Sequence, residues 1–314
     1  MTRTTPSYHA IDVGRPAPGL AAAIFDFSRG KQALLTIAQP GLGAVLALGA
    51  LPSARVLAIG VPATLAGSFS VYAFNDLLDR DVDARSLAAG KDAVPEHDVD
   101  TTFVRHPLAR DMLSLRLSVA WVVGLVLVAA LGAVALDPLA LAFFAAAVAL
   151  EVLYCALRSV TSWKTVASGV MVGCGGLAGW AAVAPLRWSA LGLFLFLALW
   201  EIGGRNIVND LSDIASDAAV GIRTVATVRG EAAAARAAAA VAAACLVSTV
   251  VLPMPLSALA LALVAGVWSL AVPAAALLRT PTPDQAASCF NRASLLPGLV
   301  LVALLLGLAL QRVS

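Results

Sequence analysis

Residues 117–136 read LSVAWVVGLVLVAALGAVAL, an unbroken run of 20 residues without a charged side chain. An α-helix rises 1.5 Å per residue, so a run of this length covers the hydrocarbon core of a bilayer, about 30 Å thick. Lipid offers no hydrogen-bond partners, and a helix satisfies all of its backbone groups within one segment. The stretch therefore predicts a transmembrane helix.

Similar apolar runs lie on both sides of this segment. Hydrophobic residues make up 60% of the chain and charged residues 13%, with a mean hydropathy of +0.89. Soluble domains are nearer half apolar and a quarter charged. We therefore predict an all-α polytopic membrane protein with nine transmembrane helices in a bundle. The eight further runs lie at about 33–51, 56–75, 139–157, 165–185, 189–210, 232–252, 256–278 and 293–310.

The basic residues predict how these nine helices are oriented. If the N-terminus is cytoplasmic, 18 of the 21 Lys and Arg residues fall on the cytoplasmic side, and only Arg55, Arg187 and Arg312 fall on the other. Loops rich in Lys and Arg stay in the cytoplasm. We therefore expect an integral protein of the cell membrane whose N-terminus and long, acidic loops are cytoplasmic.

The composition also bears on domains and partners. Residues 1–28 mix Pro, Gly and charge without a signal-peptide pattern, so we expect a cytoplasmic N-terminal segment there and one transmembrane domain over 29–314. The four cysteines lie far apart and predict buried thiols rather than disulfides or zinc ligands. The net charge of +2 comes without any basic tract, which excludes nucleic acid as an expected partner.

Two nine-residue stretches repeat one pattern, NDLLDRDVD at 75–83 and NDLSDIASD at 209–217. The first closes the predicted second helix, and the second recurs 134 residues later at the end of the sixth. Four helices separate the copies. The repeat predicts two related four-helix halves followed by a ninth helix.

Aspartates at spacing i, i+3, i+7 share one face of a continuing helix. Each repeat carries such a trio, and neighbouring asparagines add neutral oxygens for substrate binding, whereas Asp81 falls off the face. The predicted metal ligands are Asp76, Asp79 and Asp83 with Asp210, Asp213 and Asp217, and the substrate-binding asparagines are Asn75, Asn206 and Asn209.

Three carboxylates on one face repel one another unless a cation lies between them. Mg²⁺ prefers oxygen ligands and commonly bridges carboxylates to phosphate oxygens. A single acidic stripe at a helix end is as easily explained by solvated interfacial charges. A solvated face does not require the same pattern twice, so the pair predicts two stripes that hold a diphosphate through magnesium.

These motifs resemble those of the UbiA superfamily of intramembrane aromatic prenyltransferases. The resemblance covers about residues 29–310, and it is carried by 75–83, by 210–217 with Gly221-Ile222-Arg223-Thr224, and by Tyr154 with Lys164. It implies a nine-helix bundle that ionises a prenyl diphosphate with Mg²⁺ and passes the allylic cation to a lipophilic, usually aromatic acceptor.

The resemblance also implies roles for individual residues. The six aspartates would bind the metal and diphosphate, and Lys164 and Arg223 would contact phosphate oxygens. Tyr154 would stabilise the cation or position the acceptor. Positive-inside anchoring explains Lys164 and Arg223 as well, and an aromatic belt at the interface explains Tyr154.

The loop after Asp83 departs from the family pattern. Many members continue with a basic Arg-x-x-Arg-Pro-like stretch, whereas here Arg85 and Lys91 are the only nearby basic candidates for substrate binding. About 30 polar residues form a long connection, which fits a lid, an acceptor-binding element or an unstructured tether. The acceptor therefore stays open.

Two acids fall deeper in the predicted helices. Glu201 has Arg205 at i+4 and predicts a structural ion pair, and Glu151 lies one turn before Tyr154, where acceptor binding is one reading. His9, His97 and His106 lack ligand spacing and receive no role.

Three other activities remain open besides transfer to an acceptor. A UbiA-type terpene cyclase would quench the same cation internally, and a further variant moves a phosphoribosyl group to a polyprenyl phosphate. A cation-coupled transporter also carries repeats with acidic sites, but near the membrane midplane rather than at helix ends. The sequence does not define prenyl chain length, acceptor or oligomeric state.

Overall fold

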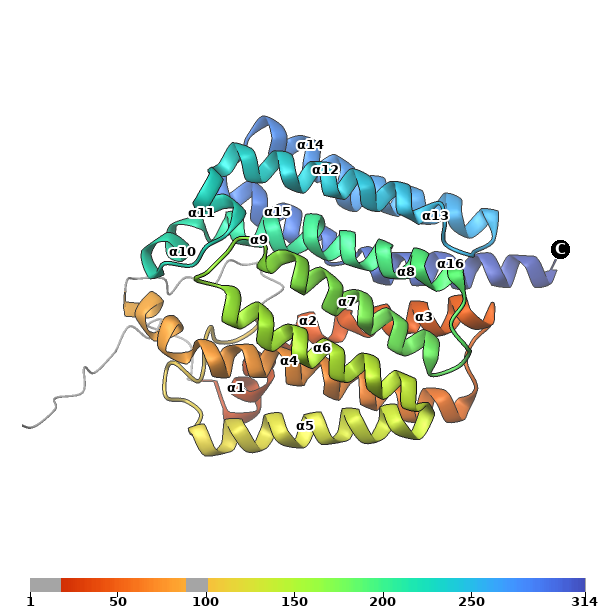
Figure 1. The fold of residues 1–314 in the computed structure, drawn as a ribbon, viewed down its shortest axis with the longest axis horizontal. Helices are drawn as coiled ribbons and strands as arrows, with labels where there is room; N and C mark the ends of the chain where they lie inside the picture. Colours follow the sequence, from red (N-terminus) through yellow and green to blue (C-terminus); the bar gives the residue numbers. More distant parts are fainter. Residues whose placement is uncertain (1–17, 89–100, 314) are drawn as a thin grey trace, which may run out of the picture.

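The computed structural model describes residues 18–88 and 101–313, and over these ranges every regular element is a helix. The long helices run alongside one another, as Figure 1 shows. Within the described residues, seven helices are long and apolar enough to cross a membrane. They are Ala54–Arg85, Leu115–Leu136, Pro138–Leu157, Trp188–Ser212, Glu231–Thr249, Leu256–Arg279 and Pro283–Arg312.

The individual elements follow the chain in this order. The first part holds α1 (Leu20–Phe27), α2 (Gly30–Thr36), α3 (Ala38–Leu48), α4 (Ala54–Ala88), α5 (Leu115–Leu136), α6 (Pro138–Leu157), α7 (Lys164–Ala181) and α8 (Trp188–Leu199). The second part holds η1 (Trp200–Asn206), α9 (Ile207–Ser212), α10 (Ile214–Val220), α11 (Val225–Arg229), α12 (Glu231–Thr249), α13 (Leu256–Gly266), η2 (Val267–Ala271), α14 (Val272–Arg279), α15 (Pro283–Ala293) and α16 (Leu296–Val313).

Each predicted apolar run coincides with helix, but two of them are not among the seven membrane-spanning candidates. The run at 165–185 is α7, whose many glycines lower its hydropathy. The run at 33–51 is divided between α2 and α3 at Ile37. Pro40 explains the break, because it has no N–H to donate to the Thr36 carbonyl. The fold is thus a polytopic helical bundle, and the nine-span count and the two related halves stay predictions.

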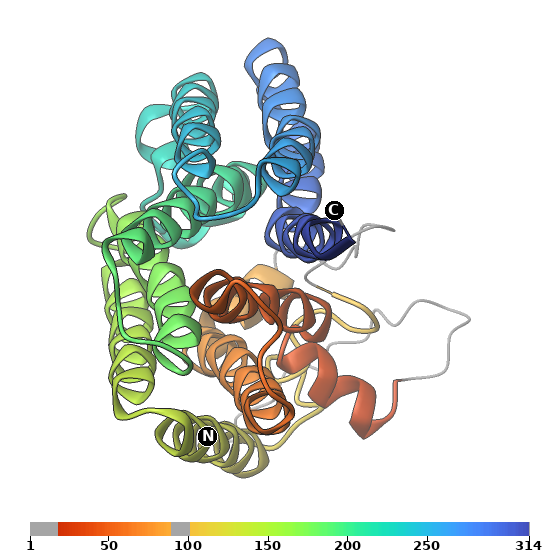
Figure 2. The ribbon, with the colours of Figure 1, turned by 90° about the vertical axis from the view of Figure 1, so that its right-hand side faces the viewer.

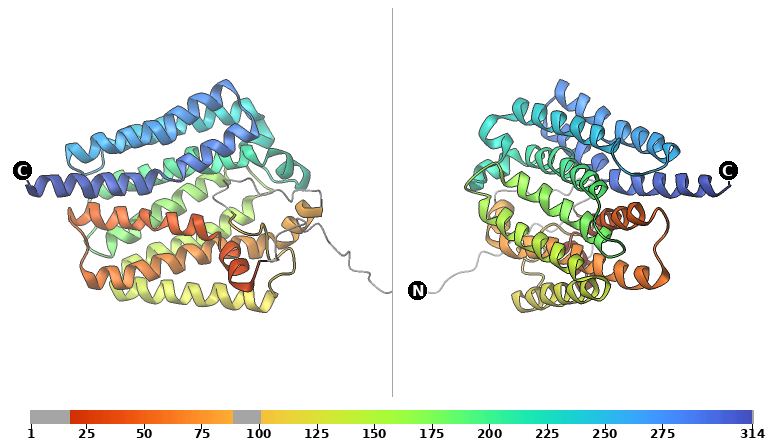
Figure 3. Two further views of the ribbon diagram at one scale, coloured as in Figure 1. Left: turned by 180° about the vertical axis from the view of Figure 1, so that it is seen from behind. Right: turned by 45° about the vertical axis from the view of Figure 1, so that its right-hand side comes forward.

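The helices surround a core that joins distant parts of the chain. Leu193, Phe196, Leu197 and Trp200 are almost fully buried at its centre. Residues of α3, α7, α12 and α16 complete the same cluster, and α16 lies beside α3 in both the end-on and rear views (Figures 2 and 3). By contrast, α5 exposes large apolar side chains along its length, as expected of a surface in contact with lipid.

Glycines let α7 approach its neighbours closely. A Cβ at Gly169 would come within 2.8 Å of the Ala198 carbonyl oxygen, and one at Gly179 would collide with the backbone of Pro40 on α3. Gly173 and Gly176 face Phe194 and Leu197 in the same way. The glycine stripe is therefore a packing surface, as such small-residue stripes are in other membrane helix pairs.

The polar ends of α4, α9 and α10 meet at one end of the bundle, on the left in Figure 1. The segment 101–113 lies here too, because Leu108 and Leu113 are buried in a cluster with Ala23 and Phe27 of α1. This end of the molecule carries both aspartate motifs.

Candidate active site

A cavity of about 470 Å³ opens between the two motifs. All six predicted aspartates line it, the first trio from α4 and the second from α9, α10 and the residue between them, Asp213. The three asparagines Asn75, Asn206 and Asn209 line it as well. Residues separated by 134 positions in the sequence therefore face one another across a single space.

The backbone conformation differs between the two motifs. The first lies within the continuous helix α4, as predicted. The second was predicted on a continuing helix, which is wrong, because α9 ends at Ser212 and α10 begins at Ile214. Polar side chains favour the break: the Ser212 and Ser216 hydroxyls donate to the carbonyls of Asn209 and Asp213 at 2.8 Å.

A π-helical segment, η1, precedes the second motif and was not anticipated from the sequence. It turns Glu201, Arg205 and Asn206 toward the cavity, and all three line it. Single π-helical turns inside α-helices occur frequently at functional sites. The predicted ion pair between Glu201 and Arg205 is present at 3.2 Å.

Basic side chains surround the aspartates of both motifs. Arg29 of the α1–α2 turn donates to Asp76 at 3.1 Å, and Lys164 at the start of α7 pairs with Asp210 at 3.0 Å. Arg158, just after α6, pairs with Asp79. These cations offset the repulsion within each trio.

The segment 101–113 contributes two further side chains. Arg105 lies 3.8 Å from Asp213, and the His106 Nδ1 lies 3.0 Å from Asp83. Asp26 holds the segment in place, because its carboxylate accepts backbone amides of Thr102, Phe103 and Val104 at 2.5–2.9 Å. The described part of the long loop is thus held against the site by hydrogen bonds and ion pairs.

The donor set fits a divalent cation. Among the described residues, Asp76, Asp83 and His106 place one potential ligand atom each within 4.8 Å of one another. Across the cavity, the Asp210 Oδ2 is buried without a hydrogen-bond partner. An uncompensated buried carboxylate oxygen is costly unless a cation approaches it.

Tyr154 and Lys164 lie together. The Lys164 ammonium donates to the Tyr154 hydroxyl at 2.9 Å and lies 4.5 Å from the centre of its ring. Asn206 also donates to this hydroxyl, at 3.2 Å. Tyr154 is thereby held at the cavity wall between the two motifs.

Three predicted residues are not brought into this group. Arg223 is exposed and does not line the cavity, although its backbone N–H donates to the Arg158 carbonyl at 2.7 Å. Arg85 is exposed on the last turn of α4 and does not line it either. Lys91 lies outside the described residues. Their substrate-binding roles stay predictions.

Sequence reasoning missed several cavity residues. Arg158 follows Tyr154 by four positions and therefore shares its helix face, a signal that was available. His106 received no role, yet it lies against the first motif. Arg29 and Arg105 lie far from their partners Asp76 and Asp213 in the sequence, so no sequence pattern could have revealed these contacts.

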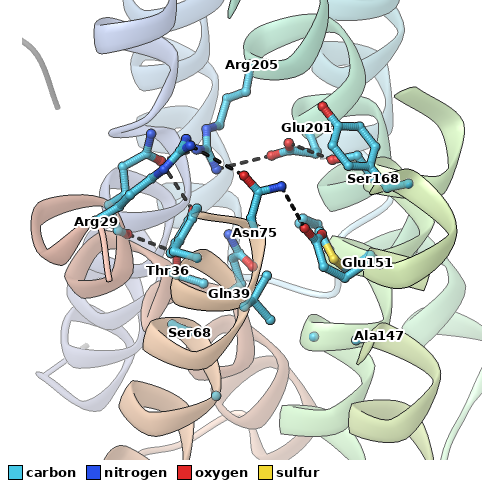
Figure 4. Close-up of a pocket in the computed structure, with 18 of the residues that line it drawn as sticks. Arg29, Thr36, Gln39, Ser68, Asn75, Ala147, Glu151, Ser168, Glu201 and Arg205 are labelled. Carbon is cyan, nitrogen blue, oxygen red and sulfur yellow. Dashed lines mark hydrogen bonds and ion pairs between the residues drawn. The ribbon is translucent and has the colours of Figure 1, made fainter. Parts of the chain in front are cut away.

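Further polar side chains line the cavity besides the aspartates, among them Asn75, Glu151 and Glu201 (Figure 4). Asn75 donates to the Glu151 carboxylate at 3.1 Å and accepts from Arg29 at 3.5 Å. Ser168 donates to Glu201 at 2.9 Å. The cavity is therefore lined by hydrogen-bonding groups of α4, α6, α7 and η1 in addition to the aspartates.

Comparison with protein families matches residues 35–296 to the UbiA prenyltransferase family. No curated protein matches the sequence. Among solved structures, a UbiA homologue from Aeropyrum pernix K1 superposes with a TM-score of 0.72 at 16% identity, covering 87% of this chain and 97% of that one.

Two other structures share the fold. A digeranylgeranylglyceryl phosphate synthase has a TM-score of 0.65 at 16% identity, covering 91% of this chain and 97% of its own. A UbiA homologue from Archaeoglobus fulgidus, bound to DMAPP and Mg²⁺, has a TM-score of 0.60 at 14% identity, covering 90% and 99%. With its paired aspartate motifs on one cavity and a family match over most of its length, the chain belongs to the UbiA prenyltransferase family.

Proposed function

We propose that the protein transfers an isoprenyl group from a prenyl diphosphate to a lipophilic, aromatic acceptor in a Mg²⁺-dependent reaction within the membrane. One observation carries the proposal: all six motif aspartates line one cavity together with Arg29, Arg158 and Lys164. Carboxylates that would hold a cation and basic side chains that would hold phosphate oxygens thus lie beside one another around one space.

Bound magnesium would neutralise the charge that develops on the departing diphosphate. The aspartates of both motifs are the residues that would hold it. Arg29, Arg158 and Lys164 would exchange their carboxylate partners for phosphate oxygens, which present the same charge and acceptor chemistry. Tyr154, with its ring at the wall, would face the allylic group as carbon–oxygen cleavage leaves it positive.

Ligands of two relatives support the diphosphate and the metal. The Archaeoglobus fulgidus homologue is described with DMAPP and Mg²⁺ in one structure and with GPP and Mg²⁺ in another. The shared fold, together with the paired acidic motifs of this chain, supports a prenyl diphosphate as the donor here. The basic-residue asymmetry supports a site at the cytoplasmic side, where a soluble diphosphate head enters while its tail lies in lipid.

The cavity wall favours transfer over internal cyclisation. Hydroxyl and amide groups of Thr36, Gln39, Ser68 and Tyr72 line the space below the motifs. Such groups recognise a polar acceptor, and they would intercept the bare carbocation that a terpene cyclase has to protect.

The first test is prenyl transfer by purified protein with Mg²⁺, radiolabelled prenyl diphosphates of graded length and candidate aromatic acceptors. Asp79→Asn and Asp213→Asn should each lower transfer by about 10²–10³-fold, because each removes one charge that holds the leaving group's counter-ion. Products are separated by thin-layer chromatography.

Asp81→Asn serves as the matched control, because Asp81 belongs to the same motif but is exposed and does not line the cavity. It should leave transfer unchanged. Equal activity of all three variants and the parent protein would contradict the proposal, as would transfer that persists without divalent cations. A cyclised hydrocarbon formed without acceptor would favour the cyclase.

A further inference from the structure

Glu151 is a buried carboxylic acid that the motifs do not account for. It lies on α6, is 4% exposed, and lines the cavity below the aspartates. Its Oε1 accepts from the Asn75 amide at 3.1 Å and lies 3.5 Å from the Cys155 thiol. No described residue donates a hydrogen bond or forms an ion pair with its second oxygen, Oε2.

Glu201, which lines the same cavity, shows how a buried acid is held by partners on both oxygens. Both of its oxygens have partners, Arg205 at 3.2 Å and Ser168 at 2.9 Å (Figure 4). Among the described residues, Glu151 has hydrogen bonds to one oxygen only and no cation paired with it, and burying a carboxylate without a cation is unfavourable. An ionisable residue that is retained within a membrane helix without an ion-pair partner indicates a function.

Glu151 is also close to the place where the carbon–oxygen bond of the donor would break. Asn75 joins the two regions, because its Nδ2 donates to Glu151 while its Oδ1 accepts from Arg29, the partner of Asp76. Figure 4 shows Asn75 between Arg29 and Glu151. Only the Asn75 side chain therefore separates a group bound at the first motif from the Glu151 carboxylate.

Resting on the proposed transfer, we infer that Glu151 is a catalytic base that accepts the hydroxyl proton of the acceptor. The C1–O bond of the prenyl diphosphate breaks, and its electron pair leaves with the diphosphate. The acceptor forms the new bond to C1 through its hydroxyl oxygen or, in a phenol, through the ring carbon conjugated with it. The hydroxyl proton passes to Oε2 of Glu151, so charge and atoms balance.

The wall near Glu151 suits such an acceptor. Tyr72, Thr36 and Gln39 lie on the same cavity, and the Tyr72 hydroxyl donates to Gln32 at 3.3 Å. These groups offer donors and acceptors that could orient a hydroxylated molecule, with its O–H directed to the unpaired Oε2.

The test compares the full-length protein with Glu151→Gln, Glu151→Asp and Asp137→Asn. Gln keeps an oxygen for the Asn75 amide but cannot take a proton, whereas Asp retains a carboxylate. Asp137 caps the same helix at its other end, accepting the Leu139 amide at 2.7 Å, and does not line the cavity. Each protein receives Mg²⁺ and radiolabelled geranyl diphosphate with 1-naphthol, 1-decanol or 1-O-octylglycerol, or with 1-methoxynaphthalene, which lacks the hydroxyl.

We expect Glu151→Gln to bind geranyl diphosphate with Mg²⁺ like the parent protein, measured by equilibrium binding, but to transfer the prenyl group about 10²–10⁴-fold more slowly. Glu151→Asp should retain part of the rate and Asp137→Asn all of it. The methoxy compound should not be prenylated.

Three outcomes would overturn the inference: an unchanged rate in Glu151→Gln, equal prenylation of the methoxy compound, or a parent protein that binds the donor and prenylates no hydroxylated acceptor. A parent protein that binds no prenyl diphosphate would instead overturn the proposed function, so the two failures are distinguishable.

Discussion

Lys164 and Asp210 form a buried ion pair at the candidate site. Their side chains are only 3% and 8% exposed, and they lie 3.0 Å apart. Two charges buried together are tolerable, but each is costly alone, because desolvation is then uncompensated. In the proposed reaction, the Lys164 ammonium of this pair would also supply positive charge to the diphosphate.

Lys164→Met should therefore destabilise the protein by about 3–5 kcal/mol, since it leaves the Asp210 carboxylate buried without its cation. Adding Asp210→Asn should restore most of the loss. Thermal unfolding in detergent measures both effects. A double variant no more stable than Lys164→Met would show that the two residues do not act as a pair.

At the scale of elements, the position of α7 depends on glycines, which have no side chain. Its glycines let α3 and α8 pack against its backbone, and Lys164 on its first turn enters the cavity as a result. Segment 101–113 is positioned instead by side-chain contacts: the Asp26 carboxylate accepts its backbone amides, and its Leu108 is buried. Close helix contact sets one wall of the site, and hydrogen-bonded backbone sets the other.

Gly179→Val should disrupt the α3–α7 contact, because the new side chain would meet the backbone around Pro40. Overpacking of this kind costs about 1–3 kcal/mol or more. Gly124→Val on α5 is the matched control, since nothing lies within 4 Å of a Cβ there. The midpoint of thermal unfolding should fall for the first variant only, and equal midpoints would contradict this account of α7.

At the scale of the whole molecule, the cavity exists only because both motif-bearing regions meet at one end of the bundle. A ligand that bridges them connects α4 to α9 and α10 and stabilises the folded form by mass action. A ligand bound to only one of the two regions would not connect them.

Mg²⁺ with geranyl diphosphate should therefore stabilise the protein by about 2.7 kcal/mol at 100 times its Kd. Each component alone should have a smaller effect, and EDTA should abolish the gain. Unfolding monitored by intrinsic fluorescence provides the measurement. Stabilisation that is undiminished by EDTA would argue against a metal-bridged diphosphate.

The sequence by itself determined that the helices fold in lipid, and it identified the aspartates of the site. Long apolar runs can only be helices in lipid, because backbone groups there need partners within their own segment. The repeated spacing of Asp76, Asp79 and Asp83 placed three carboxylates on one helix face, which local periodicity suffices to show.

Only the tertiary structure decided which side chains complete the site. Arg29, Arg105 and His106 meet the aspartates through packing between distant segments, a relation that no local periodicity encodes. The break at Asp213 and the unpaired oxygen of Glu151 likewise depend on competing hydrogen bonds and on neighbours from other helices. Sequence spacing reveals which residues share a helix face, whereas tertiary packing decides which residues of other segments lie opposite that face.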